Sequence, residues 1–132
     1  MPEFTHNGKL YYNPIELALS HIGGTWKMPI LWRLKDQVLR YGELKKDIPH
    51  ITDKMLTTQL KELEAVGLIL RTAYAEIPPR VEYSITEKGR KALPAVEMLI
   101  RYGLDLIKEY NIDIPVTDLP EEIARILGLP EK

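Results

Sequence analysis

The chain has 132 residues, a net charge of −1 and no cysteine. We expect a single folded domain, and the absence of cysteine excludes disulfides, thiolate metal sites and thiol redox chemistry. No stretch is apolar enough to span a bilayer, and the start, MPEFTHNGKL, lacks the apolar run of a secretory signal, so we expect a cytoplasmic protein without a membrane partner.

The small net charge conceals an uneven distribution. Residues 25–91 hold 13 Lys and Arg against 9 Asp and Glu, a balance of +4, whereas residues 92–132 hold 4 against 8, a balance of −4. A basic middle and an acidic end fit a nucleic-acid-facing module joined to a segment that faces elsewhere. Such a balance is also common in ordinary surface-charged domains, so charge alone does not predict nucleic-acid binding and the motifs are needed.

The first elements in chain order are two short helices. Pro14 suits the first turn of a helix that Gly23 and Gly24 end. Thr25 is then predicted to be the N-cap of a second helix, which runs to about Leu34.

A turn and a longer helix follow. Residues 41–48 read as a third short helix, and Thr52 is predicted to cap a helix that runs to Val66 and stops at Gly67. The succession of short helix, turn and longer helix is the order of a helix-turn-helix.

Two strand-like runs come next. They cover residues 68–74 and 81–85 and flank Pro78-Pro79-Arg80, which cannot continue a ladder and therefore forms the tip of a hairpin. Thr86 is predicted to cap a final long helix, which starts late or bends at Pro94. The tail carries three prolines and one short predicted helix, at 121–127.

The helix at 52–66 has two different faces. Leu56, Leu60 and Leu63 lie on one side at helical spacing. The opposite side is polar and mildly cationic: Lys54, Thr57, Thr58, Lys61 and Ala65. Lysine can reach phosphates or guanine acceptors and threonine can contact bases, so this face suits DNA, although such a face on an arbitrary helix is usually just solvated.

The hairpin supplies two further cations. Arg80 at the tip can reach a DNA backbone or a narrow minor groove. Arg71 lies on the other strand, and we expect the two arginines to line one side of the hairpin together. Most arginines at hairpin tips are ordinary surface residues, so a DNA-contacting role for Arg80 is predicted only because a helix with a cationic face precedes the hairpin.

At this point the sequence resembles the HxlR-type winged helix-turn-helix transcriptional regulators, relatives of the MarR group. The resemblance covers roughly residues 14–107. It is carried by Ile22-Gly23-Gly24-Thr25-Trp26, Tyr41-Gly42-Glu43-Leu44-Lys45, Met55-Leu56-Thr57, Gly67-Leu68-Ile69, Pro78-Pro79-Arg80-Val81-Glu82-Tyr83 and Thr86-Glu87-Lys88-Gly89, in order and at the expected spacing.

The resemblance implies an α+β winged helix over residues 14–110, after an extension at 1–13 and before a tail at 111–132. It implies a homodimer, formed by the N-terminal helix and the long C-terminal helix, on a pseudo-palindromic double-stranded DNA operator. The helix at 52–66 would enter the major groove and the wing near 76–81 would contact the adjacent backbone or minor groove. The residues implied to contact DNA are Lys27, Thr52, Lys54, Thr57, Thr58, Lys61, Arg71 and Arg80.

Two departures from the family pattern matter. Many relatives have a cysteine before the proline that opens the first helix, and here that residue is Asn13. Relatives often carry two arginines where this chain has Thr58 and Gln59, so we expect this pair to set a different operator preference.

Other functions find less support in the sequence. His6, His21 and His50 show no metal-ligand spacing, and no nucleophile has an evident base, so neither an enzyme nor a cofactor is expected. The aromatic residues leave room for an unidentified small-molecule effector between the DNA module and the dimer helices, although core packing explains each of them better. A winged-helix protein-interaction module that reads no DNA, and a ligand carrier, remain as alternatives.

Overall fold

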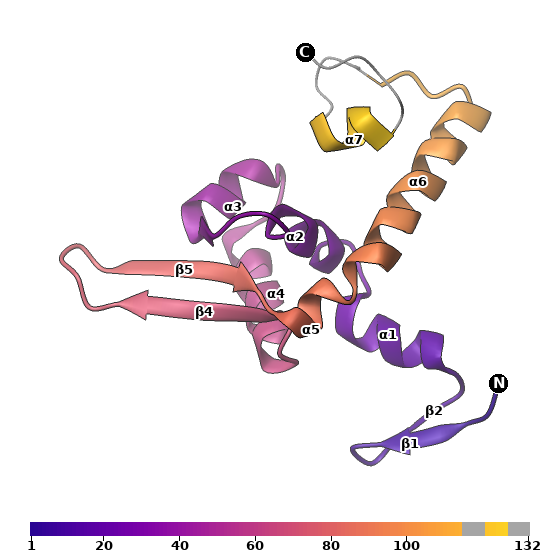
Figure 1. The fold of residues 1–132 in the computed structure, drawn as a ribbon, viewed down its shortest axis with the longest axis horizontal. Helices are drawn as coiled ribbons and strands as arrows, with labels where there is room; N and C mark the ends of the chain where they lie inside the picture. Colours follow the sequence, from indigo (N-terminus) through magenta and orange to yellow (C-terminus); the bar gives the residue numbers. More distant parts are fainter. Residues whose placement is uncertain (115–120, 127–132) are drawn as a thin grey trace. The chain divides into compact units, whose positions relative to one another are not determined.

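The computed structural model describes residues 1–114 and 121–126 (Figure 1). The chain divides into two compact units, Met1–Leu93 and Pro94–Lys132, which are described separately. No helix among the described residues is long and apolar enough to cross a membrane.

The chain begins with a hairpin that the sequence reading missed. Strands β1 (Phe4–His6) and β2 (Lys9–Tyr11) pair in antiparallel fashion, with Asn7 and Gly8 at positive φ in the turn between them. An Asn-Gly pair is a strong hairpin signal, because both residues tolerate that conformation. Tyr11 is buried and its ring stacks on Phe4 at 5.4 Å, so residues 4–11 form an ordered hairpin.

Helices α1 (Pro14–Ile22) and α2 (Lys27–Arg33) follow. Asn13 caps α1 by accepting a hydrogen bond from the Glu16 N–H at 3.1 Å, and Gly23 ends it. The predicted capping role of Thr25 is wrong. Gly24, at a φ of 94°, turns the chain so that α2 starts only at Lys27, after Trp26, and without a side-chain cap.

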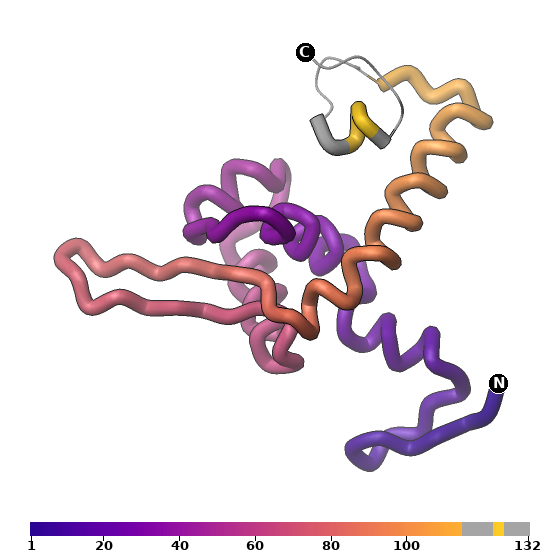
Figure 2. Tube along the Cα trace, viewed as in Figure 1, coloured from indigo at the N-terminus to yellow at the C-terminus, as the bar shows by residue number. Residues whose placement is uncertain are grey.

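A three-stranded sheet combines one short strand before the helix-turn-helix with the two strands of the hairpin after it. Its order is β3-β5-β4, formed by β3 (Leu39–Arg40), β5 (Arg80–Ile85) and β4 (Ile69–Tyr74). Helix α3 (Tyr41–Asp47) follows β3 directly. Figure 2 shows the β4–β5 hairpin extending beyond the helices of its unit, which confirms the predicted wing. Strand β3, two residues long, was not predicted.

Helix α4 (Asp53–Ala65) has the predicted limits and orientation. Thr52 caps it by accepting a hydrogen bond from the Met55 N–H at 3.1 Å, and Gly67 follows it at a φ of 79°. Its leucines pack into one core with residues of the other helices and of the sheet: Leu56, Leu60, Leu63, Ile30, Leu31, Leu34, Leu44, Leu68, Ile69 and Tyr83. Trp26 packs against this core, as expected.

The C-terminal helices follow the predicted alternative in which the long helix starts late at Pro94. Thr86 caps a short helix, α5 (Glu87–Arg90), and the long helix α6 (Leu93–Glu109) begins after a break, with Pro94 in its first turn. Gly89 lets α5 pack closely on the end of the preceding segment, because a Cβ there would lie 2.2 Å from the Leu68 carbonyl oxygen. Helix α7 (Glu121–Ile126) matches the helix predicted in the tail, apart from Leu127, which lies outside the described residues.

Candidate nucleic-acid interface

The start of α4 is tied to α3 through Asp53. The Tyr41 hydroxyl donates to the Asp53 carboxylate at 2.8 Å, and the Lys45 ammonium lies 3.4 Å from the same oxygen. The hydrogen bond from Tyr41, followed by the attraction of Lys45, lowers the pKa of Asp53 below its ordinary value. These contacts link the two helices of the helix-turn-helix at the N-terminus of α4, which is the positive end of its helix dipole.

The outer face of α4 is available for a partner. Lys54, Thr57, Thr58 and Lys61 are all exposed. None of these side chains has a hydrogen bond or ion pair with another described residue. Thr52 stands at the N-terminus of the same helix, where its hydroxyl can still donate a hydrogen bond outward.

The side of α4 that faces α2 is already occupied. The Lys27 ammonium donates to Gln59 Oε1 at 2.9 Å and forms an ion pair with Glu62, and its side chain is only 13% exposed. The Gln59 amide nitrogen also contacts Met55 Sδ at 3.5 Å. Lys27 is thus largely covered and engaged by α4, and of the pair Thr58 and Gln59 only Thr58 keeps a side chain without a partner among the described residues.

The two wing arginines lie on opposite faces of the hairpin, so the expectation that they line one side is wrong. Directly opposed residues in an antiparallel ladder point to the same face, and successive residues alternate. Arg71 opposes Tyr83, whereas Arg80 opposes Tyr74. Three residues separate Arg71 from Tyr74 along β4, an odd number, which places Arg80 on the other face.

Arg80 is enclosed by its neighbours. Its guanidinium lies 3.0 Å from the Glu76 carboxylate, 3.3 Å from the Glu82 carboxylate and 4.0 Å from the centre of the Tyr74 ring. The contacts neutralise its charge locally and restrict its rotamers. Arg71 is exposed and has no such partner among the described residues.

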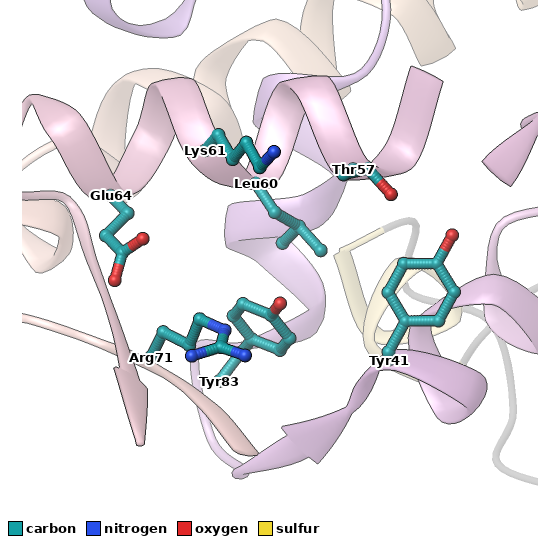
Figure 3. A pocket seen from close by; sticks show the side chains of 7 residues that line it. All are labelled: Tyr41, Thr57, Leu60, Lys61, Glu64, Arg71 and Tyr83. Carbon is teal, nitrogen blue, oxygen red and sulfur yellow. The ribbon is translucent and has the colours of Figure 1, made fainter. Parts of the chain in front are cut away.

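A cavity of about 380 Å³ lies between α4 and the wing (Figure 3). It is lined by Tyr41, Thr57, Leu60, Lys61, Glu64, Arg71 and Tyr83. The sequence reading identified three of these as DNA-contacting residues but did not expect a hollow between them. It placed a possible effector pocket elsewhere, against the dimer helices.

Helix, turn, helix and a two-stranded wing, with a third strand ahead of them, define a winged helix-turn-helix protein. Residues 21–111 match the HxlR-like helix-turn-helix family. The chain belongs to that family, and several of its relatives are described as HTH-type transcriptional regulators.

One such relative, from Methanothermobacter thermautotrophicus, is 48% identical over 93 residues, which are 70% of this chain and 71% of the relative. Another, YdzF from Bacillus subtilis, is 47% identical over 92 residues, 69% of this chain and 84% of that protein.

Solved structures agree with this assignment. The putative regulator ytcD has a TM-score of 0.69 at 45% identity, over 73% of this chain and 98% of that one. The redox regulator HypR in its oxidized form has a TM-score of 0.68 at 41% identity, over 77% of this chain and 100% of that one. This chain contains no cysteine, so it cannot use thiol oxidation as a signal.

The remaining chemistry is sparse. No group of three or more His, Asp or Glu side chains that could hold a metal occurs among the described residues. His6, His21 and His50 come from three different segments of the chain.

Proposed function

We propose that this protein binds double-stranded DNA in a sequence-specific manner and regulates transcription, with α4 in the major groove. The observation that carries the proposal is the outer face of α4, where Lys54 and Lys61 stand exposed without a carboxylate partner among the described residues. Unpaired lysines are common on solvated helices, so it is the position of this face on the second helix of a winged helix-turn-helix that favours DNA as its partner.

Each group on this face has a distinct task. Lys54 and Lys61 contact phosphates or guanine acceptors, and the hydroxyls of Thr57 and Thr58 contact base edges. The N-terminus of α4, capped by Thr52, presents backbone N–H groups to a phosphate. Gln59, held by Lys27, takes no part in reading bases, so operator preference rests on the two threonines.

The wing contributes through Arg71. Its guanidinium is free among the described residues, and it lies on the face of the hairpin that lines the cavity beside α4. Lys27 and Arg80 were also implied to contact DNA. Either residue would first have to give up its present carboxylate partners, so we assign them to the support of α4 and of the wing.

We further propose that the protein acts as a homodimer on a two-fold site. Helices α1 and α6 each expose large apolar side chains, which a monomer has no reason to keep in water: Ile15, Leu19, Met98, Leu99 and Tyr102. A two-fold dimer would set two α4 helices about one DNA turn apart, or a multiple of it.

Selection of bound duplexes from a random pool, followed by footprinting, tests the proposal. We expect a pseudo-palindromic site, and weaker binding with a shallower salt dependence for Lys54→Ala and Lys61→Ala. Thr58→Ala should lose affinity only for certain bases. Failure to enrich any sequence at moderate salt, or undiminished binding by Lys61→Glu, would refute DNA reading by α4.

A further inference from the structure

Asp53 places a negative charge at the end of α4 that the proposed function brings to DNA. It is the first residue of the helix, and its side chain is 77% exposed. In a helix-turn-helix, the N-terminal residues of the second helix approach the base edges and the first helix crosses the phosphate backbone. A carboxylate at this position repels phosphates, so it opposes the attraction that the adjacent Lys54 supplies.

The Asp53 carboxylate is engaged by two side chains of α3. Its Oδ1 accepts a hydrogen bond from the Tyr41 hydroxyl at 2.8 Å and lies 3.4 Å from the Lys45 ammonium. A carboxylate oxygen takes the place on an ammonium that a phosphate oxygen would take, because both are oxyanions that accept from the same N–H groups. The Lys45 side chain is 35% exposed, so a phosphate can reach it once the carboxylate is removed.

The ion pair distinguishes Lys45 from the other lysines of the two helices. Lys46, Lys54 and Lys61 are exposed and form no ion pair with another described residue. Of the lysines on α3 and α4, Lys45 is therefore the one with a carboxylate partner in the part of the chain that the structure describes. Because exposed ion pairs are weak, this one restrains Lys45 without fixing the fold.

We propose that Asp53 is a specificity-determining residue, which holds Lys45 back from the phosphates of DNA that lacks the operator sequence. Binding to DNA of arbitrary sequence depends almost wholly on phosphate contacts, so each lysine that is withheld weakens it. The base contacts proposed for Thr57 and Thr58 do not involve Lys45 and are kept. The inference rests on the proposed function and adds to it a residue that acts against affinity.

A freed Lys45 should affect the two kinds of DNA differently. On an arbitrary sequence the protein has no fixed register, so it can settle where a phosphate meets the ammonium. On the operator, base contacts fix the position of α4, and the freed lysine adds affinity only through a phosphate within reach of that one position. Removal of the Asp53 charge should therefore favour arbitrary DNA more than the operator.

Asp53→Asn in the full chain tests the proposal. The variant keeps an oxygen that accepts from Tyr41 and loses the charge that holds Lys45. Fluorescence anisotropy of an arbitrary duplex and of the selected duplex is measured at several salt concentrations. For the arbitrary duplex we expect binding about threefold tighter or more, and a slope of log K against log salt steeper by about 0.9 per bound subunit, the contribution of one further phosphate contact. The ratio of operator affinity to arbitrary affinity should fall.

Two comparisons isolate the freed lysine from the change in net charge. Asp47→Asn is the matched control, because Asp47 is exposed at the end of α3 and forms no ion pair with another described residue. It should leave the salt slope unchanged. Asp53→Asn made in a Lys45→Gln background should not steepen the slope either, since no lysine is left to free. Urea unfolding shows that each variant is folded.

The proposal is overturned if Asp53→Asn steepens the slope no more than Asp47→Asn, or if the steepening persists in the Lys45→Gln background. A loss of affinity confined to operators with cytosine at one position would also overturn it, because Asp53 would then read a base. If DNA binding depends on Lys61 but is indifferent to Asp53→Asn, this inference alone fails. If the unaltered protein binds no duplex, the proposed function fails and this inference fails with it.

Discussion

The two wing arginines should differ when each is replaced by glutamine. Arg71→Gln should affect DNA binding and leave stability unchanged, whereas Arg80→Gln should lower stability and leave DNA binding unchanged. Arg71 has no partner among the described residues, so Arg71→Gln should change the free energy of unfolding by less than about 0.5 kcal/mol. If Arg71 contacts one phosphate, as proposed, its loss removes about 0.9 from the slope of log K against log salt.

Arg80→Gln should give the converse. The cation–π contact with Tyr74 is worth about 0.5–1 kcal/mol at an accessible site, and the ion pairs with Glu76 and Glu82 about 0.2–1 kcal/mol each. Their loss should lower the free energy of unfolding by about 1–2 kcal/mol. The salt slope should stay unchanged, because the charge of Arg80 is already neutralised within the wing.

Urea unfolding and fluorescence-anisotropy titration of the selected duplex at several salt concentrations measure both quantities on the same preparations. Glu82→Gln is a useful third variant, because it frees part of the Arg80 charge and should steepen the salt slope. The reasoning is refuted if Arg80→Gln lowers the slope as much as Arg71→Gln while leaving the free energy of unfolding unchanged.

Four further predictions concern the scaffold of the site. In denaturant unfolding, Gly89→Ala should be destabilising by about 1–3 kcal/mol, because its Cβ would lie 2.2 Å from the Leu68 carbonyl oxygen and 2.8 Å from Ile85 Cγ1. Gly42→Ala, in a helix with nothing within 4 Å of the new Cβ, should instead raise stability by about 0.4–1 kcal/mol. The Asp53 pKa is lowered by Tyr41 and then Lys45, so its contribution is present above the ordinary value of 3.8 and is lost as pH falls through the lower folded value. The difference in the free energy of unfolding between the protein and the Tyr41→Phe variant should therefore shrink as the pH falls and Asp53 becomes protonated. An NMR titration of the Asp53 carboxyl should place its midpoint below 3.8. Lys27→Gln should weaken folding by roughly 1 kcal/mol without changing the salt slope, since Lys27 already bonds Gln59 and Glu62.

The parts of the fold that the sequence predicts well are those set by local chemistry. The leucine spacing of α4, the cap at Thr52 and the αL residue Gly67 lie within one stretch of chain, and each has a specific physical cause. The same holds for the hairpin around Pro78 and Pro79. These elements were predicted to within about two residues of their limits.

Elements set by contacts distant in sequence were predicted less well. The close approach of Gly89 in α5 to the Leu68 carbonyl group is a contact that no local pattern shows, whereas the late start of α6 was predicted from Pro94. Strand β3 has two residues and exists because Leu39 and Arg40 pair with Tyr83 and Glu82 of β5. The N-terminal hairpin is a different case, since the Asn7-Gly8 signal was in the sequence and was overlooked.

The candidate interface shows the same difference between features set by local sequence and features set by distant contacts. Helical periodicity correctly placed Lys54, Thr57, Thr58 and Lys61 on an exposed face. It could not show that Lys27 reaches Gln59 and Glu62, more than thirty residues further along the chain. For the wing, the residue types were visible but the strand register was not, and the register decides which arginine faces the cavity.

The register also decides how the wing can approach DNA. On the Arg80 face, one guanidinium is matched with the carboxylates of Glu76 and Glu82, so this face offers a phosphate backbone no net attraction. On the other face, Arg71 shares a cavity with Lys61 and Thr57 of α4. Among the described residues, a duplex that engages α4 therefore meets unpaired positive charge at Lys54 and Lys61 on the helix and at Arg71 on the wing. Mutation of the wing tip should consequently affect the shape of the wing, and mutation inside the hollow should affect binding.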